Sequence, residues 1–338
     1  MLFVIPTENG HFNNYISLFK NKDDFEGSYV LDKTSIKIVF RFLLFLIKNN
    51  KRNIVFFHGE KHYLVSVLTS FIIKRILGGK VSSIFYYAYA TSDSVIKNIF
   101  YSTSLLMMKV AGLRTFYLEL PFNNINTSYH RFFTVLHDPV LIDFDYNAQL
   151  KKEQKQEQEI KERKVSLLAA GFLDTRKCIG EIISAANLML EHDYFEKVEL
   201  TLLGCQSPDV EKIIKKSKIH PNLCIIQKNY RFDDSELISE MKNTDIVLAI
   251  YEQHFGSSGI VINSVALNKK VAFISYGVCK NFQNDLGIAK NLENTNAMTI
   301  CQFVNDLAHA TELQYSEKNR ISFLEKRDPK VFIEKLSM

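Results

Sequence analysis

A turn rich in glycine and serine, Gly256-Ser257-Ser258-Gly259, joins a predicted strand to a predicted helix. The apolar run before it, residues 245–250, has the density of a strand buried on both faces, and the pattern after it is helical. Small residues at a helix start leave backbone N–H groups free, and the helix dipole favours negative charge there. The turn therefore predicts a phosphate site, with a serine-capped helix in an ordinary βαβ unit as the alternative.

Two cations stand where a parallel sheet would bring them near this turn. Arg176 and Lys177 follow a predicted strand that ends at Gly171, and the next predicted strand ends at Gly204. Because the carboxyl ends of the strands in a doubly wound sheet open into one crevice, we expect these loops to face the glycine–serine turn. Cations and N–H donors that converge there would bind a diphosphate, whereas a solvated pair at a helix entry is the alternative.

Size and composition indicate a globular protein of two domains. The 338 residues are 46% hydrophobic and 23% charged, and a net charge of +5 is too small to indicate a nucleic-acid-binding protein. Five cysteines without a Cys-x-x-Cys spacing predict neither a disulfide framework nor a zinc site, and favour reduced thiols in the cytoplasm. No apolar run approaches the ~20 residues that span a bilayer.

Predicted strands and helices alternate along the chain, which indicates α/β domains with parallel sheets covered on both faces. Residues 1–5 are expected to be a strand and not a signal peptide. Lysine, glutamate and glutamine dominate residues 147–164, which marks a domain boundary. We expect Rossmann-like domains at residues 1–150 and 151–315, facing a cleft, and a helical segment at 316–338 that packs back on the first domain.

Motifs of the second half occur in an order that is informative as a set. A strand ends at Gly171 and a lysine, Lys177, opens a helix six residues later. The next strand ends with Leu200-x-x-x-Gly204, and a β segment at 222–226, an acidic stretch at 233–237 and the glycine–serine turn follow. In these features residues 165–275 resemble the GT-B nucleotide-sugar glycosyltransferases, in particular the retaining group called family 4.

The sequence departs from that family in two places. The arginine that usually follows the first glycine is replaced by Phe172, so Arg176 would supply the missing cation. The family's two glutamates, eight residues apart around the phosphate turn, are absent, because Phe255 and Asn263 stand at their positions. Since the second glutamate holds the donor ribose in the family, either Asn263 takes that role more weakly or the ribose is held in another way.

The resemblance implies a GT-B glycosyltransferase in which the first domain binds the acceptor and the second binds a nucleotide-diphosphate sugar. It implies a retaining hexosyl transfer without a cofactor, to a glycan or lipid-linked acceptor in bacterial surface polysaccharide synthesis. We expect the reaction to be metal-independent, since cations and N–H dipoles would neutralise the leaving diphosphate. Two alternatives remain open, a GT-B-like sugar-nucleotide epimerase and a non-catalytic module that binds a sugar nucleotide or a partner.

Candidate site residues fall on predicted strand ends. His58 would contact the transferred sugar or the acceptor, and Glu60 and Asp93 are candidate bases if the enzyme inverts. A hydrogen-bonded structural histidine is the alternative for His58, and a plain turn for Gly10 and His11. The residues expected to bind the nucleotide sugar are Gly10, His11, Gly171, Arg176, Lys177, Gly204, Asn229, Tyr230, Tyr251, Ser257, Ser258, Gly259 and Asn263.

The predicted helix at residues 35–48 combines a dense apolar background with Lys37, Arg41 and Lys48. Such a helix can lie on an acidic membrane surface, which would suit a lipid-linked acceptor and a peripheral place at the inner face of the cell membrane. A core helix whose long cations reach water explains the pattern at least as well.

Overall fold

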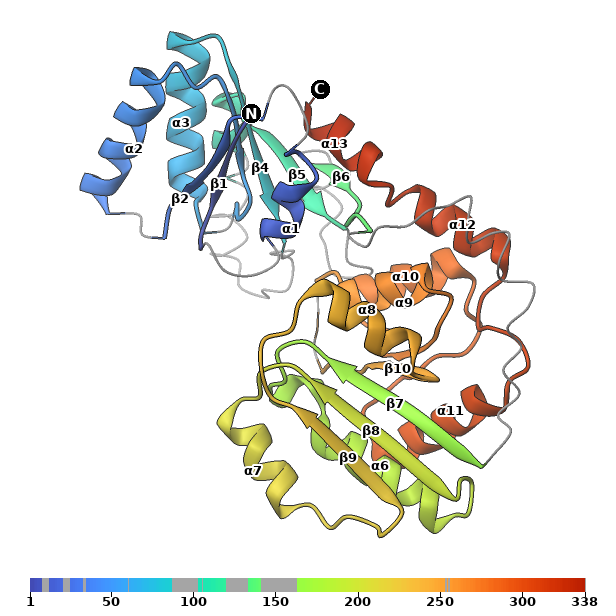
Figure 1. Cartoon of the computed structure of the whole chain (residues 1–338). Helices are drawn as coiled ribbons and strands as arrows, with labels where there is room; N and C mark the ends of the chain where they lie inside the picture. The colour runs from blue at the N-terminus through green and yellow to red at the C-terminus, as the bar shows by residue number, and fades with distance from the viewer. Residues whose placement is uncertain are drawn as a thin grey trace. The chain divides into compact units, whose positions relative to one another are not determined.

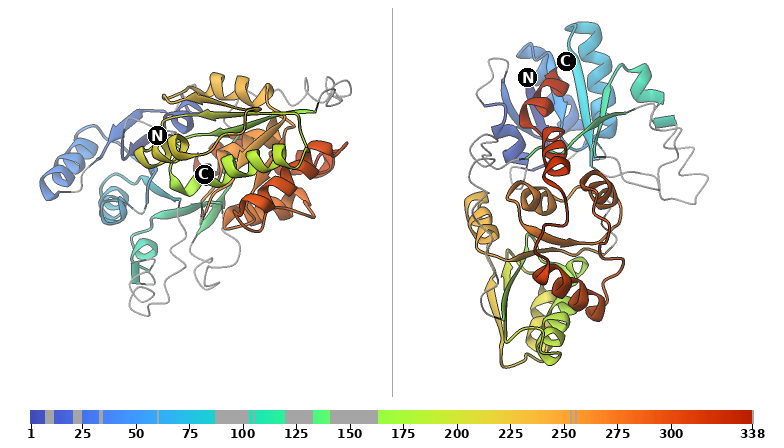
Figure 2. Two further views of the ribbon diagram at one scale, coloured as in Figure 1. Left: turned by 90° about the horizontal axis from the view of Figure 1, so that it is seen from below. Right: turned by 90° about the vertical axis from the view of Figure 1, so that its right-hand side faces the viewer.

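The structure is a computed structural model (Figures 1 and 2). In it the chain forms two compact units. Unit 1 comprises Met1–Leu141, Phe255–Ser257 and Arg327–Met338, and unit 2 comprises Ile142–His254 and Ser258–Lys326. The structure describes residues 1–7, 12–20, 25–32, 35–59, 61–86, 103–104, 106–119, 133–140, 163–252, 254 and 256–337.

Unit 1 is built on a six-stranded parallel sheet in the order β2-β1-β3-β4-β5-β6. Its strands are β1 (Leu2–Ile5), β2 (Gly27–Val30), β3 (Asn53–Phe56), β4 (Lys80–Phe85), β5 (Arg114–Leu118) and β6 (Thr134–Leu136). Alternate residues of β1 enter two different cores: Leu2 and Val4 one, and Phe3 and Ile5 the other. Both faces of the sheet are therefore covered, as the unbroken apolar run of β1 predicts.

Different helices cover the two faces of this sheet. The core around Leu2 and Val4 receives side chains from α2 (Ile36–Lys48), α3 (Tyr63–Ile76) and the helical residues 106–110. The core around Phe3 and Ile5 receives α1 (Phe12–Ser17) and α13 (Pro329–Ser337).

Unit 2 is built on a five-stranded parallel sheet in the order β11-β10-β7-β8-β9. Its strands are β7 (Lys164–Ala170), β8 (Lys197–Leu203), β9 (Leu223–Lys228), β10 (Ile246–Ala249) and β11 (Lys270–Phe273). Its helices are α6 (Ile179–Glu191), α7 (Pro208–Lys216), α8 (Asp234–Lys242), α9 (Gly259–Ala266), α10 (Val278–Leu286), α11 (Ala297–His309) and α12 (Glu317–Glu325). Figure 1 shows α6 and α11 on one face of the sheet and α8, α9 and α10 on the other.

Most helices of unit 2 begin at a side chain that accepts a hydrogen bond from the first turn. These capping residues are Ser207 of α7, Asp233 of α8, Ser258 of α9, Asn296 of α11 and Ser316 of α12. Such a cap satisfies one of the backbone donors that every helix start leaves without an intrahelical partner, and is worth about 1 kcal/mol. None of the helices that the structure describes is long and apolar enough to span a bilayer.

The expected alternation of strands and helices into two parallel sheets is confirmed. Strand β2 is an addition, since its short sequence Gly27–Val30 carries a glycine and little strand pattern. After residue 315, α12 belongs to unit 2 and α13 belongs to unit 1. In α12, the buried Arg320 donates to the carbonyls of Val265 and Ala266 in unit 2, whereas α13 buries Phe332 in unit 1.

Candidate functional site

The strand order of unit 2 marks one point at which its connections diverge. From β7 the chain proceeds through β8 to β9 at one edge, and β10 and β11 fill the other edge. The loops after β7 and β10 therefore leave neighbouring strands, which pair at Leu168 and Val247, towards opposite faces of the sheet. Such a point is called the switch point of a doubly wound sheet, and ligands bind there. The loop with Arg176 and Lys177 and the loop with the glycine–serine turn both begin at this point.

Backbone hydrogen bonds join the loops at this sheet edge. The amide of Gly171 donates to Leu203 O (2.9 Å), and the amide of Leu173 donates to Cys205 O (2.9 Å). The amide of Glu252 donates to Arg176 O at 2.7 Å. The loops after β7, β8 and β10 are thus one connected structure, which a site needs if its groups are to be held in place before the ligand arrives.

Lys177 lies at the centre of this structure. Its amino group donates to Ala170 O at the end of β7 and lies 5.0 Å from the centroid of the Tyr251 ring, a cation–π distance. The Ser258 hydroxyl, which also caps α9, donates to the Tyr251 hydroxyl at 3.5 Å. Tyr251 therefore connects the cation to the start of α9, and burial lowers the pKa of Lys177 to about 8, which leaves it mostly charged at neutral pH.

Two glycines allow the close approach of these loops. Gly171 has φ +104°, and a Cβ there would stand 2.6 Å from the amino nitrogen of Lys177. Gly204 has φ +123°, and a Cβ there would stand 2.1 Å from the carbonyl oxygen of Gly171. Any other residue at these positions would be strained in its backbone and would push the loops apart.

Arg176 reaches the site mainly through its main chain. Its guanidinium binds the carboxylate of Asp174, with Nε and Nη2 2.9 and 2.8 Å from Oδ2, and the side chain is exposed. Asp174 also caps the short 3-10 helix Thr175–Lys177 that carries both cations. The charge of Arg176 is thus partly compensated, and Lys177 is the cation that the fold directs to the strand ends.

The remaining candidates of unit 2 lie around the same edge. Gly259 is the first residue of α9 and Asn263 lies one turn further along. Asn229 accepts a hydrogen bond from the backbone N–H of Gln206 and donates to Glu211, and Tyr230 donates to Glu236. Both follow β9, so they line the edge next to the loop after β8.

One residue of this edge was not among the expected site residues. The side chain of Gln206 is buried, and neither its amide nitrogen nor its oxygen has a hydrogen-bond partner. A buried amide without a partner is costly, and it is suited to the edge of a nucleobase. The available signal was its position, two residues after Gly204 at the end of a strand.

Solved structures of other proteins share this architecture. The N-terminal domain of Candida albicans trehalose-6-phosphate phosphatase is 11% identical, with 99% of this chain and 96% of that chain covered and a TM-score of 0.65. Anabaena HepE in complex with UDP and glucose is 10% identical, with 99% and 98% covered and a TM-score of 0.63. The trehalose-6-phosphate synthase OtsA is 13% identical, with 97% and 84% covered and a TM-score of 0.59.

HepE and OtsA are GT-B glycosyltransferases, and both units of this chain have the matching parallel sheet. The chain has the GT-B fold. No protein-family model matches the sequence, and no curated protein matches it. At 9–13% identity the likeness establishes the fold, and the substrate has to be argued from the residues.

In the first GT-B domain, unit 1, the strand order places the corresponding switch point between β1 and β3. His58 follows β3 at this point, where its Nδ1 accepts a hydrogen bond from the amide of Lys61 at 3.4 Å. The other candidates of this domain, Gly10, His11, Glu60 and Asp93, lie outside the described residues.

A buried polar cluster at the ends of β5 and β6 was also missed by sequence reasoning. Asp138 accepts hydrogen bonds from the hydroxyls of Tyr15 (2.5 Å) and Ser257 (2.6 Å). Glu119 accepts from the amide of Asp138 and pairs with Arg327 at 2.9 Å. Ser257, which the sequence assigns to the phosphate turn, is thus tied to Asp138 within unit 1, while the next residue caps α9 of unit 2.

The carboxyl group of Asp138 should make stability depend on pH. Burial, with the nearby Glu119 adding to it, raises the Asp138 pKa from 3.8 to about 6, against the hydrogen bonds of Ser257 and Tyr15 and the charge of Arg327. Below pH 4, where Asp138 is protonated, the buried carboxyl does not lower the free energy of unfolding. As pH rises from 4 to 6, ionisation of Asp138 lowers the free energy of unfolding progressively. Asp138→Asn should remove about 2–3 kcal/mol of this loss, measured by urea unfolding at pH 4 and 7. An unchanged pH slope in the variant would contradict the assignment.

Within the described ranges, no three His, Cys, Asp or Glu side chains are placed to hold a metal ion. The sequence does contain one Asp-x-Asp triplet, Asp143-Phe144-Asp145, which can offer carboxylates to a divalent cation but lies outside those ranges. The expectation of a metal-independent reaction therefore stays a prediction.

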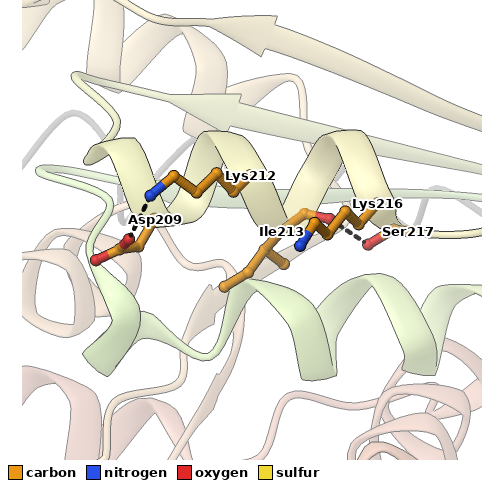
Figure 3. A pocket seen from close by; sticks show the side chains of 5 residues that line it. All are labelled: Asp209, Lys212, Ile213, Lys216 and Ser217. Atoms are coloured by element: carbon orange, nitrogen blue, oxygen red, sulfur yellow. Dashed lines mark hydrogen bonds and ion pairs between the residues drawn. The ribbon is translucent and has the colours of Figure 1, made fainter.

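The hollow in Figure 3 is a surface feature of α7, lined by Asp209, Lys212, Ile213, Lys216 and Ser217, and its main charges form an ion pair between Lys212 and Asp209.

Proposed function

We propose that the chain is a glycosyltransferase that moves a hexose from a nucleotide-diphosphate sugar to a glycan or lipid-linked acceptor. The observation that carries the proposal is the position of Lys177, between Gly171 and the Tyr251 ring at the switch point of unit 2. A half-buried cation beside a helix start offers a pyrophosphate both opposite charge and N–H donors. The fold supports the same conclusion, since structures of the neighbour HepE contain UDP-glucose in one case and UDP and glucose in another.

The chemical role of Lys177 follows from where charge develops. When the bond between the anomeric carbon and the β-phosphate oxygen breaks, the electron pair stays on the departing diphosphate. The ammonium of Lys177 and the first-turn amides of α9 are fixed before the reaction, so they stabilise this charge without reorganising. The guanidinium of Arg176, although paired with Asp174, adds positive potential at the same edge.

We infer retention of the anomeric configuration without a metal ion. The leaving phosphate would accept the proton of the acceptor hydroxyl as the new bond forms on the same face of the sugar. A structure of the neighbouring trehalose-6-phosphate synthase concerns glycosyl transfer with retention, which supports this course. His58 is our candidate for contact with the sugar or the acceptor, and Glu60 and Asp93 are the candidate bases of an inverting reaction.

The nucleoside would lie at the edge formed by the loops after β8 and β9. The unpartnered amide of Gln206 would read the base, and Asn229 and Tyr230 would shape the pocket. Asn263 would hold the ribose less strongly than a carboxylate, since a neutral amide makes weaker hydrogen bonds than an ionised group. We place the reaction in the cytoplasm, at the inner face of a bacterial membrane, as a step of surface polysaccharide synthesis.

The direct test is a thermal-shift screen of the full chain with UDP, GDP, dTDP and CMP, with and without EDTA. We expect one nucleoside diphosphate to stabilise the protein in both conditions, by about 2.7 kcal/mol at a hundred times its dissociation constant. Slow release of that diphosphate from its sugar nucleotide without acceptor would distinguish a transferase from a binding module or an epimerase. Failure of all four nucleotides to bind would overturn the proposal, and loss of binding with EDTA would overturn metal independence.

A further inference from the structure

The exposed large apolar side chains of the described residues are concentrated on three helical segments of unit 1. Eleven of the fifteen lie on α2, on α3 or in residues 106–110, and several are mostly exposed, such as Ile36 (90%) and Val110 (76%). The eleven are Ile36, Phe40, Leu44, Ile47, Leu64, Leu68, Phe71, Ile76, Leu106, Met107 and Val110. Monomeric proteins rarely expose so much apolar surface in one region without a use for it.

The three segments lie on the same side of the sheet. Each contributes to one core, α2 through Phe42, α3 through Val65 and residues 106–110 through Met108. The Tyr63 hydroxyl of α3 donates to Ser104 O at 3.0 Å, and α2 lies beside α3 (Figure 1). Their outward sides therefore form one surface, which we name the α2–α3 face.

The exposed apolar residues of α2 form a stripe next to its buried side. Ile36, Phe40, Leu44 and Ile47 follow the spacing i, i+4, i+8 and i+11, which places them on one side of the helix. The core side is occupied by other residues, among them Phe42. The apolar surface of the helix thus extends beyond its core side, and its packing in unit 1 leaves the exposed stripe uncovered.

The charges of the α2–α3 face have one sign. Its three helical segments contain no aspartate or glutamate, and their basic residues are Lys37, Arg41, Lys48, Lys74, Arg75 and Lys109. Lys37 and Arg41 flank the apolar stripe of α2, and the guanidinium of Arg75 lies over the ring of Phe71 at 4.8 Å. Apolar stripes flanked by cations, without anions, match a surface that is apolar inside and negatively charged outside.

We propose that the α2–α3 face docks unit 1 on a bilayer of anionic phospholipid, with its apolar stripes in the headgroup–acyl boundary and its cations on the lipid phosphates. A second copy of this chain fits poorly, because two such faces would bring twelve cations together without an anion. The inference deepens the proposed function and rests on it, because a lipid-linked acceptor would be the reason for docking on a membrane. Its test needs no sugar-nucleotide donor.

Vesicle sedimentation tests the proposal directly. We expect the full chain to sediment with vesicles of phosphatidylglycerol and phosphatidylcholine at 0.1 M NaCl, and to bind pure phosphatidylcholine vesicles far less. Lys37→Gln/Arg41→Gln should weaken binding to the anionic vesicles by about 30-fold. Raising NaCl to 0.5 M should also weaken this binding, because salt screens the charges. Phe40→Ser/Leu44→Ser should weaken binding to both kinds of vesicle.

A matched control comes from unit 2, where α7 carries exposed lysines and the nearby Ile219 is 42% exposed. Lys215→Gln/Lys216→Gln and Ile219→Ser should leave sedimentation unchanged. Equal loss in these variants, no binding to anionic vesicles, or a dimer in analytical ultracentrifugation that Phe40→Ser/Leu44→Ser dissociates would overturn the proposal. Nucleoside diphosphate binding, measured by thermal shift in every variant, distinguishes a failure of docking from a failure of the proposed function.

Discussion

Replacing Lys177 by alanine should lower kcat/KM for the nucleotide sugar by about 10²–10³-fold, or 2.7–4 kcal/mol of transition-state stabilisation. The reason is that its ammonium is held at the end of β7 by Ala170 O and by the Tyr251 ring, where the leaving diphosphate would gain charge. Since the same charge attracts the product, the dissociation constant of the nucleoside diphosphate should also rise. Steady-state kinetics and calorimetric titration measure the two effects.

The matched control is Lys270→Ala. Lys270 is also half-buried in unit 2, its amino group also donates to backbone carbonyls, those of Ala308 and Ala310, and burial also lowers its pKa. It begins β11, however, and so lies at the amino edge of the sheet, away from the switch point. Lys270→Ala should cost stability and leave diphosphate affinity unchanged. If Lys177→Ala retained full diphosphate affinity, the site would be assigned wrongly.

The pH dependence of binding gives a second view of the same group. Burial lowers the pKa of Lys177 from 10.5 to about 8, so its charge is present below pH 8 and is lost as pH rises through that value. Affinity for a diphosphate should therefore fall above pH 8 in the wild type. In Lys177→Ala, where nothing titrates at this position, the affinity above and below pH 8 should differ much less.

The arrangement of loops at the carboxyl edge of the unit 2 sheet could be predicted because its parts are local. A strand that ends in glycine, a cation at the next helix and a serine cap each lie within a few residues, and the rule for doubly wound sheets then brings the loops together. Lys177 and Ser258 are accordingly joined in the structure through Tyr251. The compensation of Arg176 by Asp174 was not foreseen, because a pair two residues apart in a loop has no periodic signal.

The polar cluster of unit 1 could not be predicted from the sequence. Tyr15 and Asp138 are 123 residues apart, and Arg327 reaches Glu119 from the far end of the chain. No local pattern specifies contacts of that range, and only the burial of their charges identifies them. The α2–α3 face was anticipated for residues 35–48 only, because the continuation of the exposed stripe on α3 depends on how the helices pack.

Arg327→Met should destabilise unit 1 by about 3–5 kcal/mol, because it leaves the carboxylate of Glu119 buried without its cation. Both side chains are buried, and the guanidinium Nη2 lies 2.9 Å from Oε1 of Glu119. Glu119 also has φ +61°, a conformation that a non-glycine residue adopts at a cost. Without Arg327, Glu119 keeps its hydrogen bonds to the Asp138 amide and to His137, which hold this strained residue less firmly.

The adjacent residue provides the control. Lys326 pairs with Asp285 at 2.9 Å, but both side chains are reached by solvent, so Lys326→Met should cost less than about 1 kcal/mol. Glu119→Gln/Arg327→Met should recover most of the loss, because no charge then remains buried without a partner. Urea unfolding of the four proteins measures these differences. Equal effects of Arg327→Met and Lys326→Met, or no recovery in the double variant, would show that the pair is not what stabilises this cluster. Because Glu119 orients Asp138, and Asp138 binds Ser257, loss of the pair should also loosen the turn that leads into α9 and weaken diphosphate binding in the folded fraction.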